Sequence, residues 1–183
     1  MRRIVVSFCS AVLPLLPASA AIVINEIHYN PDVKTEPAEF VELINTGSTA
    51  VNLAGWYFSD GINYTFPARN VAPGGRVVVA QNPTFLQTKY AVSGALGPFN
   101  ADRSSGLSSR GERLTLRNAA GQVEDEVEYQ LGYPWPTVGD ATIPGQGNSI
   151  ELIHPALDNN LGGSWRSSLR GGGANGPTPG RTN

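Results

Sequence analysis

The sequence predicts a single all-β domain, a sandwich of about seven to nine short strands with one short helix. Three observations carry this prediction. The chain of 183 residues contains 21 glycines and 14 prolines, a composition typical of a fold with many turns. Short β-branched and aromatic runs recur between those turns, and only one segment carries a helix start signal. The length suits one domain with a sizeable core.

The N-terminus has the pattern of a secretory signal peptide. Arg2-Arg3 precedes an apolar run over residues 4–17 and the small-residue site Ala18-Ser19-Ala20. We expect cleavage after Ala20, a mature domain over residues 21–168, and a secreted or periplasmic location. The apolar run is too short to span a bilayer, and no later stretch approaches the roughly 18–20 apolar residues that a spanning helix needs.

Cleavage changes both the thiol content and the charge. Cys9, the one cysteine, lies inside the signal, so we expect a mature chain without disulfides. Without Arg2 and Arg3, the 13 basic residues become 11 against 15 acidic ones, a formal charge of −4. This acidic balance argues against nucleic acid or anionic lipid as a partner, because both are bound through Lys and Arg.

The first strands follow the signal. Residues 22–29 alternate, which puts Ile22, Ile24, Glu26 and His28 on one face. Residues 40–44 form the second strand, and residues 51–53 resume the apolar pattern. Residues 56–58 and 62–66 flank Asp60-Gly61, a pair typical of a tight hairpin.

A buried strand and the helix come next. The continuous valines of residues 76–80 favour a strand covered on both faces. Asn82-Pro83 then gives an N-cap followed by proline at the first helical position, so the helix should run to about Tyr90. Phe85, Leu86 and Tyr90 are spaced to face inward.

The last predicted strands cover residues 112–117, 122–129 and 149–154. Asp125 falls on an apolar face with Val123, Val127 and Tyr129, so its carboxylate should be hydrogen-bonded to other groups of the domain. Residues 169–183 are mostly Gly, Pro, Thr and Asn, which predicts a disordered tail or linker.

An ordered set of short motifs over about residues 22–165 resembles the lamin-tail domain family. The motifs are Ile24-Asn25-Glu26-Ile27, Glu39-Phe40-Val41-Glu42-Leu43, Val51-Asn52-Leu53, Gly55-Trp56, Pro73-Gly74, Gly111-Glu112 and Gly121-Gln122-Val123. The resemblance implies an immunoglobulin-like sandwich with a binding or scaffolding role, found in bacteria in secreted proteins and beside catalytic modules. It also implies that Glu26 and Glu42 are structural and that Trp56 belongs to the core.

Catalytic chemistry has few candidate residues. His28 and His154 are the only imidazoles, and neither lies near a G-x-S-x-G turn. Glu26, Glu39 and Glu42 offer a glycosidase-like pair of carboxylates, but we interpret Glu26 and Glu42, which recur in the family pattern, as structural residues that bond to backbone or hydroxyl donors at the sandwich edge. We therefore predict no catalytic residue, no cofactor and no enzymatic activity.

Calcium is an alternative that the oxygen-rich loops leave open. Candidate ligands are Asn25, Glu26, His28, Asn30 and Asp32, and a second loop carries Leu157-Asp158-Asn159-Asn160. Their spacing matches no calcium loop, and alternation separates Asn25 from Glu26 and His28. We predict no metal ligand, and interpret the second loop as a turn.

Aromatic residues raise a sugar-stacking alternative. The candidates are Trp56, Tyr57, Tyr64, Tyr133 and Trp135. A stacking platform requires Tyr133 and Trp135 to be coplanar and accessible, whereas a core and loop-anchor role requires burial. In either case we expect a ligand at the loops around Asp32, Phe99 or Trp135.

The predicted function is a secreted, non-catalytic binding or structural module whose partner is an extracellular or envelope protein, or a polysaccharide. The alternative is an accessory module of an extracellular hydrolase or nuclease system.

Overall fold

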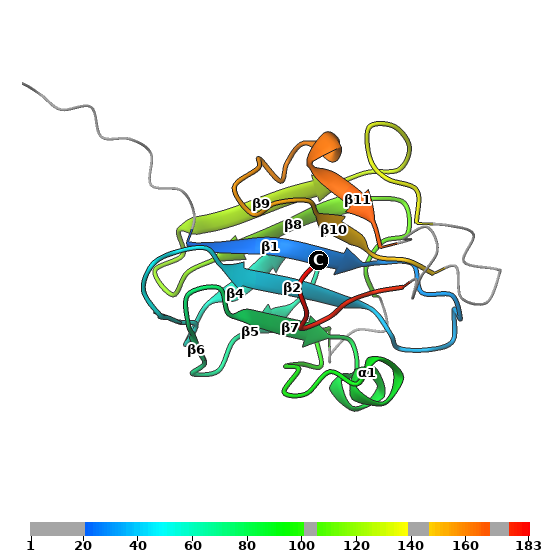
Figure 1. Cartoon of the computed structure of the whole chain (residues 1–183). Coiled ribbons are helices and arrows are strands. Elements are labelled where there is room, and N and C mark those ends of the chain that lie inside the picture. Colours follow the sequence, from blue (N-terminus) through cyan, green and yellow to red (C-terminus); the bar gives the residue numbers. More distant parts are fainter. Residues whose placement is uncertain (1–20, 101–105, 139–146, 169–175) are drawn as a thin grey trace, which may run out of the picture.

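Two antiparallel sheets pack face to face in the computed structural model, which describes residues 21–100, 106–138, 147–168 and 176–183 (Figure 1). The front sheet has the spatial order β11 (Trp165–Ser167), β10 (Ile150–Leu152), β1 (Ile22–His28), β2 (Phe40–Asn45), β7 (Arg76–Ala80). The rear sheet has the order β5 (Tyr64–Thr65), β4 (Tyr57–Asp60), β8 (Glu112–Arg117), β9 (Val123–Tyr129). A two-stranded ribbon pairs β3 (Val51–Asn52) with β6 (Asn70–Val71).

The core lies between the two sheets. Its buried side chains include Ile27 and Leu43 from the front sheet and Leu114 and Val127 from the rear, with Trp56 beside them. The all-β sandwich with one helix is therefore confirmed. The described residues form eleven strands, more than the seven to nine expected, and β6 and β11, two and three residues long, are the ones that the sequence did not indicate.

A β-bulge interrupts β1. Ile24 pairs with Leu43 but Glu26 pairs with Glu42, so Asn25 is an extra residue in the ladder. Ile24 and Ile27 consequently both reach the core, while Glu26 turns to the outer face. The expectation of unbroken alternation in this strand, with Ile24 and Glu26 on one face, is wrong because the bulge shifts the pattern by one residue.

The helix α1 (Pro83–Tyr90) covers part of the outer face of the front sheet (Figure 1). Asn82 is the N-cap, and its side-chain oxygen accepts a hydrogen bond from the Phe85 N–H at 3.0 Å. Leu86 is fully buried in a second apolar cluster with Phe40 and Val78. The other two residues expected to face inward, Phe85 and Tyr90, are only half-buried.

Residues 176–183 lie across the outer face of the same sheet, in front of β1 and β2 (Figure 1). They differ from the expected disordered tail because their polar groups bond to strand side chains. Residues 169–175, the rest of that tail, and the expected signal peptide lie outside the described residues. In the part of the chain that the structure describes, no helix has the length and apolar character needed to cross a membrane.

Candidate functional site

Three glutamates stand side by side on the outer face of the front sheet. In the β10–β1–β2 ladders, Glu26 pairs with Glu151 on one side and with Glu42 on the other. Side chains in register on antiparallel strands share a face, and all three have no exposed surface. We call Glu151, Glu26 and Glu42 the glutamate row.

The two outer members of the row have cationic partners. Arg166 Nε lies 3.3 Å from Glu151 Oε2, and Arg76 Nε lies 3.2 Å from Glu42 Oε1. Glu26, in the centre, accepts a hydrogen bond of 2.5 Å from the Ser149 hydroxyl. Burial, together with the neighbouring acids, raises the pKa of Glu26 to about 8, and burial raises that of Glu42 to about 7. Burial therefore favours the neutral form of Glu26, the central member of the row.

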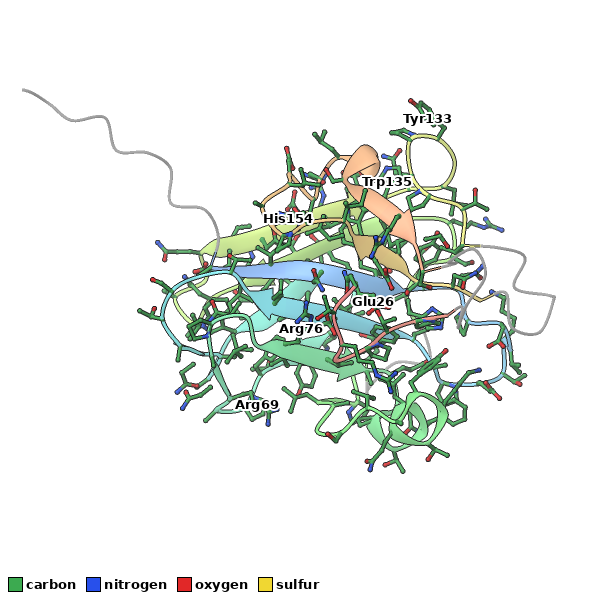
Figure 2. The ribbon with its side chains drawn as sticks, viewed as in Figure 1. Glu26, Arg69, Arg76, Tyr133, Trp135 and His154 are labelled. Atoms are coloured by element: carbon green, nitrogen blue, oxygen red, sulfur yellow. The ribbon has the colours of Figure 1, made fainter. Side chains whose placement is uncertain are left out.

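Residues 176–183 supply the remaining donors (Figure 2). The Thr178 N–H donates to Glu26 Oε1 at 2.9 Å, and the Gly180 N–H donates to Glu42 Oε2 at 2.6 Å. The Thr178 hydroxyl donates to Glu151 Oε1 at 2.9 Å. Each carboxyl group of the row thus binds at least one donor of this segment, and the Thr178 hydroxyl also lies 3.5 Å from Glu26 Oε2.

The row differs from a catalytic carboxylate pair. Glu26 and Glu42 are covered, and Glu39 is elsewhere, where it accepts the Leu107 N–H at 2.7 Å. Glu26 and Glu42 bond to backbone and hydroxyl donors, as the sequence led us to expect, but in the interior of a five-stranded sheet and not at its edge. Glu151 and Arg166 were not predicted from the sequence. The sequence does contain an indication of the role of Glu151, because this acid stands between two aliphatic residues of a predicted strand.

The two histidines lie in different places. His28 is fully buried against Phe40 and Tyr90, with its Nε2 atom 3.2 Å from the Tyr90 hydroxyl. Burial lowers the pKa of His28 to about 3, so the ring is neutral. His154 Nδ1 accepts the Ala156 N–H at 3.2 Å on an exposed loop. The contacts of both imidazoles are therefore those of structural residues.

The candidate calcium ligands are not brought together. The Asn25 amide donates to Glu42 at 2.8 Å in the row, whereas Asp32 is ion-paired with Lys89 at 2.7 Å near α1. Asn30 accepts a hydrogen bond from Lys34. Across residues 21–100, 106–138, 147–168 and 176–183, no group of three or more His, Cys, Asp or Glu side chains has the arrangement of a metal site.

The loop that was interpreted as a turn ties the two sheets together. Asp158 accepts the Asn160 N–H as in an Asx turn. The Asn159 amide donates to Asp125 Oδ2 at 2.7 Å, and the same oxygen accepts the Ile24 N–H at 2.6 Å. Asp125 is thus hydrogen-bonded, as predicted, to β1 and to this loop. The role of Asn159 was not predicted, because the composition of this loop is typical of any turn.

The aromatic candidates do not form a stacking platform. Trp135 is only 7% exposed and packs against Trp165, with ring centroids 6.2 Å apart. Trp56 is in the core, as expected. Tyr133, by contrast, is fully exposed at the tip of its loop (Figure 2). Because Trp135 is buried, the condition set for carbohydrate stacking is not met.

The loops that carry Trp135 and Gly162 also carry exposed apolar side chains. Leu131 is 55% exposed and Leu161 is 58% exposed. Their two loops touch directly, since a Cβ atom at Gly162 would come within 2.9 Å of the Trp135 ring. We call Leu131, Tyr133 and Leu161 the loop patch. A ligand was expected at the loops around Asp32, Phe99 or Trp135. Phe99 and Trp135 are themselves buried and Asp32 is ion-paired, so the loop patch near Trp135 is the exposed candidate surface.

The fold defines an immunoglobulin-like β-sandwich module in which the three carboxyl groups of the glutamate row are buried. The family model described as Lamin Tail Domain matches residues 16–130, and the chain belongs to this family. The family is a non-catalytic, immunoglobulin-like module in general. A search of curated proteins gives no match. The matched residues contain β1 to β9, whereas β10 and β11 complete the front sheet beyond them, and residues 176–183 lie on its outer face.

Proposed function

We propose that this protein is a secreted, non-catalytic binding module that recognises a protein in the cell envelope or outside the cell through the loop patch. The single observation that carries the proposal is a fully exposed tyrosine and two exposed leucines on two touching loops that are anchored by buried tryptophans. The signal-peptide pattern over residues 1–20 supports the location.

The anchoring of the patch favours recognition. Trp165 Nε1 donates to the Asn159 carbonyl at 2.8 Å, and the Trp135 N–H donates to the Gly132 carbonyl at 2.9 Å. Both loops are therefore fixed beneath the exposed side chains, which lowers the entropy lost when a partner binds. Tyrosine is enriched in protein interfaces because its ring supplies a large contact area with few rotatable bonds.

The direct test is capture of a partner by the mature chain. Residues 21–183 are immobilised and exposed to envelope and secreted fractions, with and without calcium, and captured proteins are identified by mass spectrometry. We expect one protein to be retained by the wild type and lost from the Tyr133→Ser/Leu161→Ser variant. Both changes are on exposed side chains, so the unfolding transition should be unaffected.

Val123→Ser is the matched control. Val123 is 50% exposed at the start of β9, whereas Leu131 and Tyr133 follow the end of that strand, so the control removes a similar apolar side chain at the other end of β9. The control should retain the partner. Capture that survives the double substitution, or the absence of any specific capture, would contradict the proposal. Capture of a secreted hydrolase would favour the accessory-module alternative.

A further inference from the structure

The segment of residues 176–183 lies on the glutamate row and directs the backbone N–H donors of its central four residues to the carboxyl groups of the row. Its central sequence is Pro177-Thr178-Pro179-Gly180, and proline has no N–H. The only N–H groups in these four residues are therefore those of Thr178 and Gly180. Both of them donate to the row, to Glu26 and Glu42 respectively. Every backbone donor of the four residues is bound by a buried carboxyl group.

Further contacts fix the end of the segment. The Asn183 amide donates to the backbone carbonyls of Asn25 at 3.0 Å and Leu152 at 3.2 Å, and its oxygen accepts from the Asn25 amide at 3.1 Å. Gly180 has a φ of +77°, in the left-handed region, and a Cβ atom there would lie 3.2 Å from the Val92 side chain. Pro179 is buried, whereas Arg181 and Thr182 are exposed.

These contacts resemble recognition of a bound peptide more than strand pairing. The segment adds no strand to the sheet, and it is held through side chains of the sheet face. Prolines restrict the free peptide to extended conformations, so little entropy is lost on binding. The receptor side is also built in advance, because Arg166, Ser149 and Arg76 already position the three carboxyl groups.

We propose that the glutamate row is a peptide-binding site for an extended Thr-Pro-Gly segment, filled here by residues 176–183 of the same chain, and that it takes the same segment from a second copy. The contacts that select the segment are identical whichever copy supplies it. Every copy carries both the site and its ligand, which is the arrangement required for exchange of a segment between protomers. The site is separate from the loop patch, so it stands or falls independently of the proposed partner.

The first test measures binding of a synthetic peptide with the sequence of residues 176–183, labelled for fluorescence anisotropy, which stands in for the segment of a second copy. The receptor is the full mature chain with Thr178→Pro and Gly180→Pro, which removes both N–H donors from its own segment. We expect saturable binding to this variant and at least tenfold weaker binding to the wild type, whose own segment competes. The control peptide carries the same two prolines and should not bind.

Failure of the folded variant to bind the peptide, or equal binding of both peptides, would overturn the proposal. A second measurement does not depend on any variant. In the wild type, hydrogen exchange of the Thr178 and Gly180 amides should be protected, yet at least tenfold faster than exchange of the Ile27 and Val41 amides, because an exchangeable ligand opens without global unfolding. Protection equal to that of β1 and β2, or no protection, would make the segment a fixed part of the core or an unbound tail.

Discussion

At the scale of single residues, Glu26 is the most informative position. It is fully buried, has acids on both sides in the row, and has a hydroxyl and an N–H as its donors. The cationic groups facing the row, Arg76 and Arg166, are paired with the outer two members. Burial therefore favours the neutral carboxyl group at this position.

This arrangement predicts a pH-dependent stability. The pKa of Glu26 is raised from 4.5 to about 8 on folding. The stability that the neutral Glu26 contributes is therefore fully present below pH 4.5 and is lost as the pH rises through 8. Glu26→Gln mimics the neutral acid. At about 1.4 kcal/mol per pKa unit, the stability of the variant relative to wild type should rise by on the order of 2 kcal/mol or more between pH 5 and pH 9.

The measurement is urea unfolding of both proteins across that range. The difference between the two curves removes the titration of distant acids such as Glu39, whose pKa is also raised, to about 7. Glu42 pairs with Glu26 in the row, so the difference reports Glu26 together with its coupling to Glu42. Parallel pH profiles of the wild type and the variant would show that Glu26 is already ionised in the folded protein.

At the scale of elements, a contact between β1, the central strand of the front sheet, and β9, an edge strand of the rear sheet, joins the two sheets. Asp125 accepts the Ile24 N–H, one residue before the extra residue of the bulge, where the pairing of β1 with β10 has ended. The carboxylate thus satisfies a backbone donor that the ladder leaves open. It also holds the Asn159 loop against both strands.

Asp125→Ala should lower the free energy of unfolding by about 1–3 kcal/mol, because the buried Ile24 N–H loses its acceptor. Asp125→Asn keeps a side-chain oxygen at the same place and should retain most of the stability. Chemical denaturation of the three proteins compares them directly. A loss of less than 0.5 kcal/mol for the alanine variant, about the usual size of a surface effect, would remove this role from Asp125.

The elements show which parts of the structure the sequence determines. Strands with regular patterns, the Asp60-Gly61 hairpin and the Asn82 cap were predictable, since each depends on local preferences. The bulge at Asn25 was not, because it depends on pairing with β2 and the row it creates is a property of three strands. The binding of residues 176–183 was hidden for another reason: its donors are backbone N–H groups, which composition does not reveal.

At the scale of the whole molecule, the sandwich must be stable without covalent cross-links. The one cysteine is Cys9, within the predicted signal peptide, and the core between the sheets consists of aliphatic and aromatic side chains. Burial of this apolar surface is therefore the main source of stability expected for the mature chain.

The exported protein should consequently begin at Ala21 and contain no thiol. Intact-mass spectrometry checks the start, and a maleimide reagent should label the precursor once and the exported protein not at all. Its melting temperature should be the same with and without a reducing agent. A labelled exported protein would place the cleavage site before Cys9 or show that the segment is retained.

The central position of β1 also determines when the front sheet can be completed. This strand is the first of the described strands to be synthesised, and its neighbour β2 is the next. Its other neighbour, β10, comes much later in the chain. Glu26 also bonds to Ser149 and Thr178, which follow it by 123 and 152 residues respectively. Until the ribosome has released the last third of the chain, β1 has one bare edge. Contacts of such long range slow folding, so a truncated product ending before Ile150 would present an open strand edge for aggregation.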